Sequence, residues 1–202
     1  MESSPTLNKT VKGPHDLHVI LLGSHNVGKS SLIRNFCHEP FREESSTCIG
    51  SKNFRKPLHL SNVENKLENN GRLRIECFRD LNKLELKSAQ VVVICYDPSN
   101  AESWDGALRC LDDTLSEHVR VYFCATKLDL ISESRPRVVR PEVVKVIASH
   151  IKAKIIETSA KVPKSADPLF NTIIEDYVSG FPEYQKWSTT LKAKISTMFH
   201  HK

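Results

Sequence analysis

A glycine-bounded loop carries the clearest chemistry in the sequence. The residues from Gly23 to Ser30 match the pattern G-x-x-x-x-G-K-[ST] in full. In this pattern the backbone N–H groups face phosphate oxygens, the Lys29 ammonium reaches the β- and γ-phosphates, and the Ser30 hydroxyl lies on Mg²⁺. We therefore predict a phosphate-binding loop, with nucleotide contacts from Gly23, His25, Asn26, Val27, Gly28, Lys29, Ser30 and Ser31.

The apolar pattern around this loop predicts the elements that position it. The run from Val19 to Leu22 predicts a buried strand, and the apolar residues after Lys29 fall at helical spacing. The alternation continues, with strands predicted at 91–96, 119–125 and 154–156 and helices that contain Trp104, begin at Pro141 and begin near Asp167. Such alternation favours an α/β fold with a mostly parallel sheet and helices on both faces.

The rest of the chain predicts less regular structure. Residues 39–56 are mostly polar and predict an exposed loop. After it, residues 54–75 predict a hairpin with its tip at 69–71. Residues 1–16 predict a disordered tail, which leaves 17–180 as the folded domain. The extension 181–202 has apolar residues at amphipathic spacing, namely Trp187, Leu191, Ile195 and Met198. Such a stretch either binds a membrane or a partner protein, or packs back on the folded domain.

Length and composition exclude several classes of protein. The chain has 202 residues, and a prior of about 150 residues per domain favours one domain with extensions. Its longest apolar run, 91–96, is far shorter than the roughly 18 residues of a transmembrane helix. The net charge is +5, but the basic residues are scattered among acidic ones, so we expect no nucleic-acid partner. The N-terminus has no secretory pattern, so we expect a cytoplasmic protein whose six cysteines are thiols.

Four segments in order resemble the Ras-superfamily small GTPases, and the Rab branch most closely. They are the phosphate loop, Tyr-Asp-Pro-Ser-Asn-Ala-Glu-Ser-Trp at 96–104, Thr-Lys-Leu-Asp at 126–129, and Glu-Thr-Ser-Ala-Lys at 157–161. The resemblance covers about residues 17 to 180. It implies the P-loop small-GTPase fold with a six-stranded sheet, GTP or GDP with Mg²⁺ as ligands, and protein effectors or complex subunits as partners.

The resemblance places the guanine contacts in two segments. Asp129 would accept hydrogen bonds from the ring N–H and the exocyclic amine of guanine, a pair that adenine cannot offer. Lys127 would lie along the ribose. Most of the family has Asn where this chain has Thr126, but the Rho branch also has Thr there, so we expect guanine binding to persist. The residues that this resemblance implies as base contacts are Thr126, Lys127, Asp129, Ser159, Ala160 through its N–H, and Lys161 against the base plane.

The family's third motif, Asp-x-x-Gly-Gln, is changed in this chain. Aligned on the strand that ends near Ile75, Cys77 replaces the Asp, Asp80 the Gly that meets the γ-phosphate, and Leu81 the Gln that orients the attacking water. In a shifted alignment Asp80 is the acid itself, but the residues after it still supply neither Gly nor Gln. We therefore predict no catalytic residues and little or no hydrolysis.

The metal side of the site also departs from the family. The position of the Mg²⁺-binding Thr falls on Cys48, and Thr47 lies one residue early, so we predict Ser30 and Thr47 as ligands and weaker Mg²⁺ binding than is usual. His25 occupies a loop position where the family tolerates small residues; it either obstructs the site or acts as a base. Asn26 tolerates the positive φ that the loop requires.

These features predict an atypical, pseudo-GTPase-like protein that binds a guanine nucleotide and serves as an adaptor in an intracellular complex, of a trafficking or cytoskeletal type. Two alternatives stay open, namely an active GTPase switch with displaced or partner-supplied catalytic groups, and a scaffold that binds no nucleotide. The last cysteine is Cys124 and the second residue is Glu2, so we expect no direct lipid anchor and membrane contact only through partners.

Overall fold

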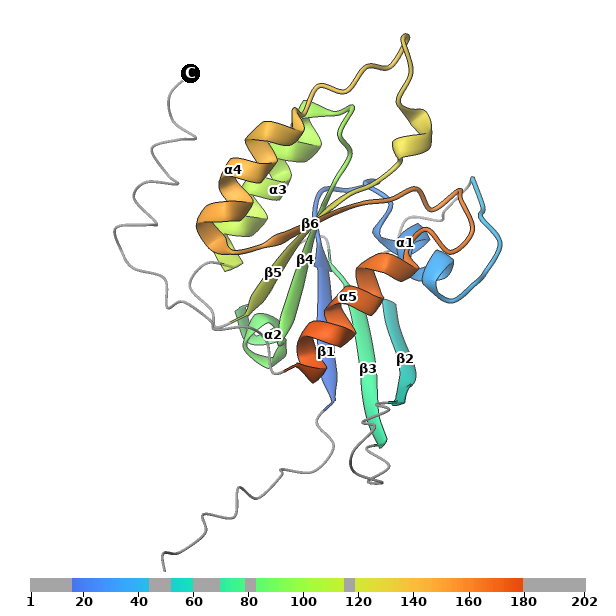
Figure 1. The fold of residues 1–202 in the computed structure, drawn as a ribbon, viewed down its shortest axis with the longest axis vertical. Helices are drawn as coiled ribbons and strands as arrows, with labels where there is room; N and C mark the ends of the chain where they lie inside the picture. The colour runs from blue at the N-terminus through green and yellow to red at the C-terminus, as the bar shows by residue number, and fades with distance from the viewer. Residues whose placement is uncertain (1–15, 44–51, 60–69, 79–82, 115–118, 180–202) are drawn as a thin grey trace, which may run out of the picture.

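The computed structural model describes residues 16–43, 52–59, 70–78, 83–114 and 119–179 (Figure 1). The predicted N-terminal tail and C-terminal extension lie almost wholly outside these ranges. No helix among the described residues is long and apolar enough to cross a membrane.

Within the described ranges, six strands form one sheet in the order β2-β3-β1-β4-β5-β6. The strands are β1 (Leu17–Leu22), β2 (Lys52–His59), β3 (Asn70–Cys77), β4 (Val91–Tyr96), β5 (Arg120–Ala125) and β6 (Lys154–Glu157). The edge strand β2 is antiparallel to β3, and every other pair is parallel. The central strands β1 and β4 are buried at every position, and all their residues but His18 are apolar or aromatic, because both faces of the sheet are covered. The predicted mostly parallel, six-stranded α/β fold is confirmed.

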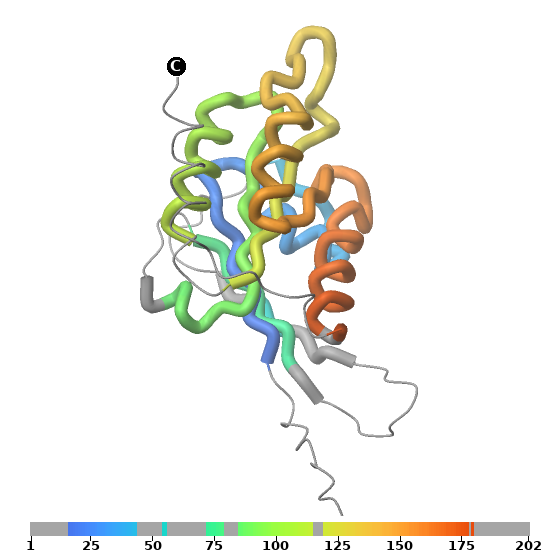
Figure 2. Tube along the Cα trace, turned by 60° about the vertical axis from the view of Figure 1, so that its left-hand side comes forward, coloured from blue at the N-terminus to red at the C-terminus, as the bar shows by residue number. Residues whose placement is uncertain are grey.

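Helices cover both faces of the sheet, as Figure 2 shows. They are α1 (Lys29–Phe36), α2 (Lys83–Ser88), α3 (Ala101–Thr114), α4 (Pro141–Ile151) and α5 (Asp167–Val178), with a 3₁₀ turn at Leu128–Leu130. On one face α1 and α5 bury Leu32, Ile33, Phe36, Leu169, Phe170 and Ile173. On the other, α2, α3 and α4 bury Leu86, Trp104, Leu111, Val144 and Ile147. The sheet is thus fixed from both sides, and its strand ends present the connecting loops.

The hairpin is real, but its predicted tip was wrong. Antiparallel pairing runs from Lys52 opposite Cys77 to His59 opposite Asn70. Asn70 and Gly71 therefore belong to β3, although Asn-Gly is a strong local turn signal. Pairing along the whole strand overrides that signal, and residues 60–69, which connect the two strands, lie outside the described residues. The predicted loop at 39–56 also ends early, because β2 begins at Lys52.

The Asp-Pro pair at 167–168 predicts Asp167 as the cap residue of α5, but the cap lies one residue earlier. Ala166 is the N-cap residue, and Asp167 is the first residue of the helix. Asp167 therefore places its carboxylate in the first turn, where negative charge is favourable, instead of acting as the cap.

Candidate functional site

The phosphate loop connects β1 to α1 and depends on unusual backbone angles. Gly23 and Gly28 have φ values of 136° and 96°, and Asn26 has a φ of 59°, as its tolerance of this region predicts. A Cβ atom on Gly23 would lie 2.3 Å from the Cys95 carbonyl oxygen, so this position has room only for glycine. Gly28 is the N-cap residue of α1 and adds no side chain at the helix end where a phosphate would bind.

The Lys29 side chain lies within the curve of this loop. Its ammonium donates hydrogen bonds to the carbonyl oxygens of Gly23, at 2.7 Å, and Ser24, at 2.8 Å. Ser30 and Ser31 follow in the first turn of α1. His25 and Asn26 of this loop are exposed. The loop, the lysine and the N-terminus of α1 therefore lie together, and the phosphate contacts of these residues stay a prediction.

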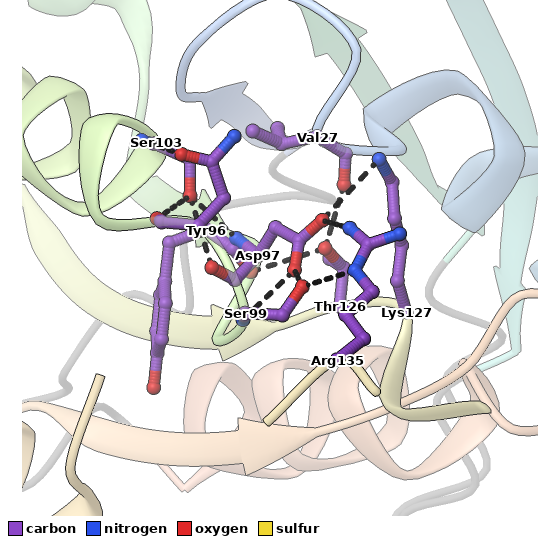
Figure 3. A network of polar contacts seen from close by, with 9 residues as sticks. Val27, Tyr96, Asp97, Ser99, Ser103, Thr126, Lys127 and Arg135 are labelled. Atoms are coloured by element: carbon purple, nitrogen blue, oxygen red, sulfur yellow. Dashed lines mark hydrogen bonds and ion pairs between the residues drawn. The ribbon is translucent and has the colours of Figure 1, made fainter. Parts of the chain in front are cut away.

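Thr126, the first residue of the predicted base segment 126–129, contacts the phosphate loop (Figure 3). It follows β5, is 3% exposed, and its hydroxyl lies 2.6 Å from the Val27 carbonyl oxygen and 3.0 Å from that of Tyr96. The hydroxyl has one proton, so it donates to these carbonyl oxygens in turn or shares the proton between them. Thr126 therefore acts within the chain, tying the phosphate loop to the ends of β4 and β5.

The carboxylate of Asp129 is oriented by a neighbouring loop. The hydroxyl of Ser159 donates to Asp129 Oδ1 and accepts a hydrogen bond of 3.2 Å from the Lys161 backbone N–H. Ser159 is 6% exposed, whereas Asp129 faces solvent at the carboxyl edge of the sheet. The two predicted base segments thus meet, and Ser159 holds one carboxylate oxygen in place.

Asn35 holds the loop after β6, and the sequence analysis missed it. Its amide nitrogen donates to the carbonyl oxygens of Ala160, at 3.0 Å, and Val162, at 2.7 Å. Its amide oxygen accepts a bond of 2.9 Å from the Ala166 N–H. The available signal was a polar residue three positions after Leu32, on the apolar face of α1. Asn35 therefore fixes Ala160, whose N–H is the predicted partner of the guanine oxygen.

Cys77 lies beside Ser30, where the family's motif has a carboxylate. It is the last residue of β3, is 3% exposed, and its Sγ lies 3.7 Å from the Ser30 Oγ. A thiol is a soft donor, and Mg²⁺ prefers oxygen ligands, so this pair does not match the donor set that the ion requires. Thr47, Cys48, Asp80 and Leu81 lie outside the described residues. Within those residues, no group of three His, Cys, Asp or Glu side chains is placed to hold a metal.

Comparison with known proteins agrees with this geometry. The sequence profile of the Ras family matches residues 18–179, from β1 to the end of α5. The chain belongs to the Ras family. Similar proteins within it include several Rab proteins, so this chain is a Rab-like small GTPase.

Three of these relatives cover most of the Rab-like chain. It is 30% identical to the Ras-related protein Rab-24 of Dictyostelium discoideum over 164 residues, which are 80% of this chain and 81% of that protein. Identity is 27% to RabH of the same organism, over 82% of this chain and 83% of the relative. It is 29% to Rab-5B of Plasmodium falciparum, over 82% and 79% respectively.

Proposed function

We propose that this Rab-like small GTPase binds GTP or GDP at the edge formed by the phosphate loop and the two base segments. The Ser159–Asp129 hydrogen bond carries the proposal, because it orients a carboxylate for the two donors of guanine at the same edge as Lys29. Lys29 would hold the phosphates, and the Ala160 N–H would face the guanine oxygen. The folded domain that does this spans about residues 17–180.

The bound nucleotide is hydrolysed little or not at all. Hydrolysis in this class depends on positioned water and on charge stabilisation around the γ-phosphate. Cys77 beside Ser30 supports this part of the proposal, since it removes the carboxylate from the metal side. The same replacement supports weaker Mg²⁺ binding than the family has in general.

The protein then acts as an adaptor that the bound nucleotide stabilises. A protein that keeps its nucleotide does not cycle between two forms, so its role is to present one surface to protein partners in a cytoplasmic complex. The chemistry of the site supports this pseudo-GTPase role and does not identify the complex.

The nucleotide content of the purified full-length protein tests the proposal. The protein is denatured, and the supernatant is separated by anion-exchange chromatography. Stoichiometric GTP is the expected result. Predominant GDP would favour an active switch with displaced or partner-supplied catalytic groups, and an empty site would favour a scaffold without nucleotide.

Single-turnover hydrolysis provides the second test. We expect phosphate release from GTP far slower than is usual for the family, and no further loss in Lys29→Ala once nucleotide binding is accounted for. Release at ordinary family rates that Lys29→Ala and Ser30→Ala both abolish would overturn the claim of weak hydrolysis.

A further inference from the structure

Asp97, which follows β4, is a buried carboxylate that neither base segment contains. It is 2% exposed, and the polar groups that contact its carboxylate are all hydrogen-bond donors or cations. Its Oδ1 accepts hydrogen bonds from the Ser99 N–H, at 3.0 Å, and the Ser99 hydroxyl, at 2.6 Å. Its backbone N–H and carbonyl oxygen both bond the Ser103 hydroxyl, at 2.9 and 3.0 Å. The carboxylate is therefore held rigidly at the edge of the nucleotide site.

Two cations share the other carboxylate oxygen of Asp97 (Figure 3). The Arg135 guanidinium donates to Oδ2 from Nη2 at 2.8 Å, while the Lys127 ammonium lies 3.5 Å from the same atom. A direct charge-assisted bond measures about 2.7–2.9 Å, so Arg135 is bonded and Lys127 is only oriented. Arg135 also donates from Nε to the Ser99 hydroxyl at 2.6 Å, so its guanidinium bonds both the Asp97 carboxylate and the Ser99 hydroxyl.

The Lys127 stem passes along the phosphate loop. A Cβ atom built on Gly28 would lie 3.9 Å from Lys127 Cε, and Lys127 itself has a φ of 55° at the start of the 3₁₀ turn. Thr126, next to it, is bonded to Val27 of the same loop. The position of the Lys127 ammonium is thus set on one side by the loop and on the other by Asp97.

We propose that Asp97 and Arg135 form a clamp that positions Lys127 and so sets the lifetime of the bound nucleotide. Arg135 satisfies the buried carboxylate, which leaves the ammonium of Lys127 at 3.5 Å and available to the nucleotide. Without Arg135, the buried carboxylate would draw Lys127 into direct contact and away from the ligand. The clamp rests on the proposed nucleotide binding and adds two positioning residues to it.

The same loop supplies a matched control. Arg137 lies two residues after Arg135 and also forms an ion pair, but its partner is Glu157, through bonds of 2.7 and 3.1 Å. Arg137→Gln therefore removes a comparable charge and salt bridge from the same loop without touching Asp97. A general loosening of the loop would affect both variants alike.

The experiment measures the release of fluorescent methylanthraniloyl-GDP from full-length protein by chase with excess GDP. We expect Arg135→Gln to accelerate release about tenfold and Arg137→Gln less than twofold. In a Lys127→Met background, which already releases nucleotide faster, Arg135→Gln should add less than twofold, because the clamp acts through that ammonium. If Arg135 had a purely structural role, Arg135→Gln would accelerate release by the same factor in the wild-type and Lys127→Met proteins.

The outcomes separate the clamp from the nucleotide site. Equal effects of Arg135→Gln and Arg137→Gln, or a full tenfold effect in the Lys127→Met background, would overturn the clamp while leaving nucleotide binding intact. A wild-type protein that takes up no fluorescent GDP would overturn the proposed function, and the clamp with it. Melting curves of each variant confirm that release is measured on folded protein.

Discussion

The base half of the site and its phosphate and metal half differ in how far they keep the family's chemistry. On the base side, Asp129 is oriented by Ser159, and Asn35 fixes the loop that carries Ala160. On the metal side, the phosphate loop and Lys29 are in place, but Cys77 lies beside Ser30. Holding a nucleotide and hydrolysing it depend on different residues, so a chain can keep the first ability while the second decays.

Asp129→Asn should have the largest effect, because it tests whether the base half selects guanine. The amide loses the charge and one of two acceptors, so GDP affinity should fall roughly 10³-fold. An amide N–H can instead donate to the oxygen that xanthine carries in place of the amine, so xanthosine diphosphate should become the better ligand. Competition binding with both nucleotides measures the change, with Asp112→Asn, at an exposed position of α3, as the control. Unchanged preference for GDP would remove Asp129 from the base site.

Asn35→Ala should have the next largest effect, on stability and on the base half together. The substitution removes three hydrogen bonds from a residue that is 6% exposed and leaves the carbonyl oxygens of Ala160 and Val162 without this partner. We expect a loss of about 2 kcal/mol in the free energy of unfolding, measured by urea denaturation. Base selectivity should weaken in the same variant, because Ala160 loses its support. A loss of stability with selectivity intact would show that Asn35 serves only the fold.

The helices and strands of this fold are predictable because the apolar pattern and the helix-start residues in the sequence match the positions that are buried or that begin a helix in the structure. The apolar run 91–96 is β4 to the residue, and Pro141 starts α4 as its fixed φ predicts. The phosphate loop is also predictable, because the fixed spacing of its two glycines and its lysine in the sequence determines how the backbone bends. The contacts of Asp97 with Arg135 and of Asn35 with Ala160 are not, since no pattern in one sequence says which polar side chains meet across 38 and 125 residues.

Cys77→Asp should restore chemistry to the metal half and has a smaller expected effect. The substitution would place a carboxylate, which is a hard oxygen donor suited to Mg²⁺, beside Ser30, where the wild-type protein has a thiol. We expect Mg²⁺ to slow nucleotide release about tenfold in this variant and hardly at all in the wild type, in chase experiments with and without EDTA. Cys77→Ser, which keeps the size of the thiol without its softness or a charge, is the control. A wild-type protein already as sensitive to EDTA as Cys77→Asp would show that the metal half is intact.

The pH dependence of stability gives the smallest effect and compares two acids in different elements, Asp97 in the loop after β4 and Asp176 in α5. Burial alone would raise the pKa of Asp97, but the Ser99 hydrogen bonds, Lys127 and Arg135 together hold that pKa below its ordinary value. The pKa of Asp176 is likewise lowered, against its own burial, by hydrogen bonds from Lys154 and Tyr122. A depressed carboxyl pKa adds stability that is present above the unfolded value, near pH 4, and lost as the pH falls through the folded value.

Asp97→Asn and Asp176→Asn should therefore each flatten the decline in unfolding free energy below about pH 4, as urea titrations at successive pH values would show. Only Asp97→Asn should also change the release of GDP at neutral pH, because Asp176 pairs with Lys154 at 2.7 Å and Tyr122 at 2.6 Å and makes no contact with Lys127. Equal changes in GDP release from the two variants would mean that Asp97 acts on the nucleotide through general stability instead of through the base half.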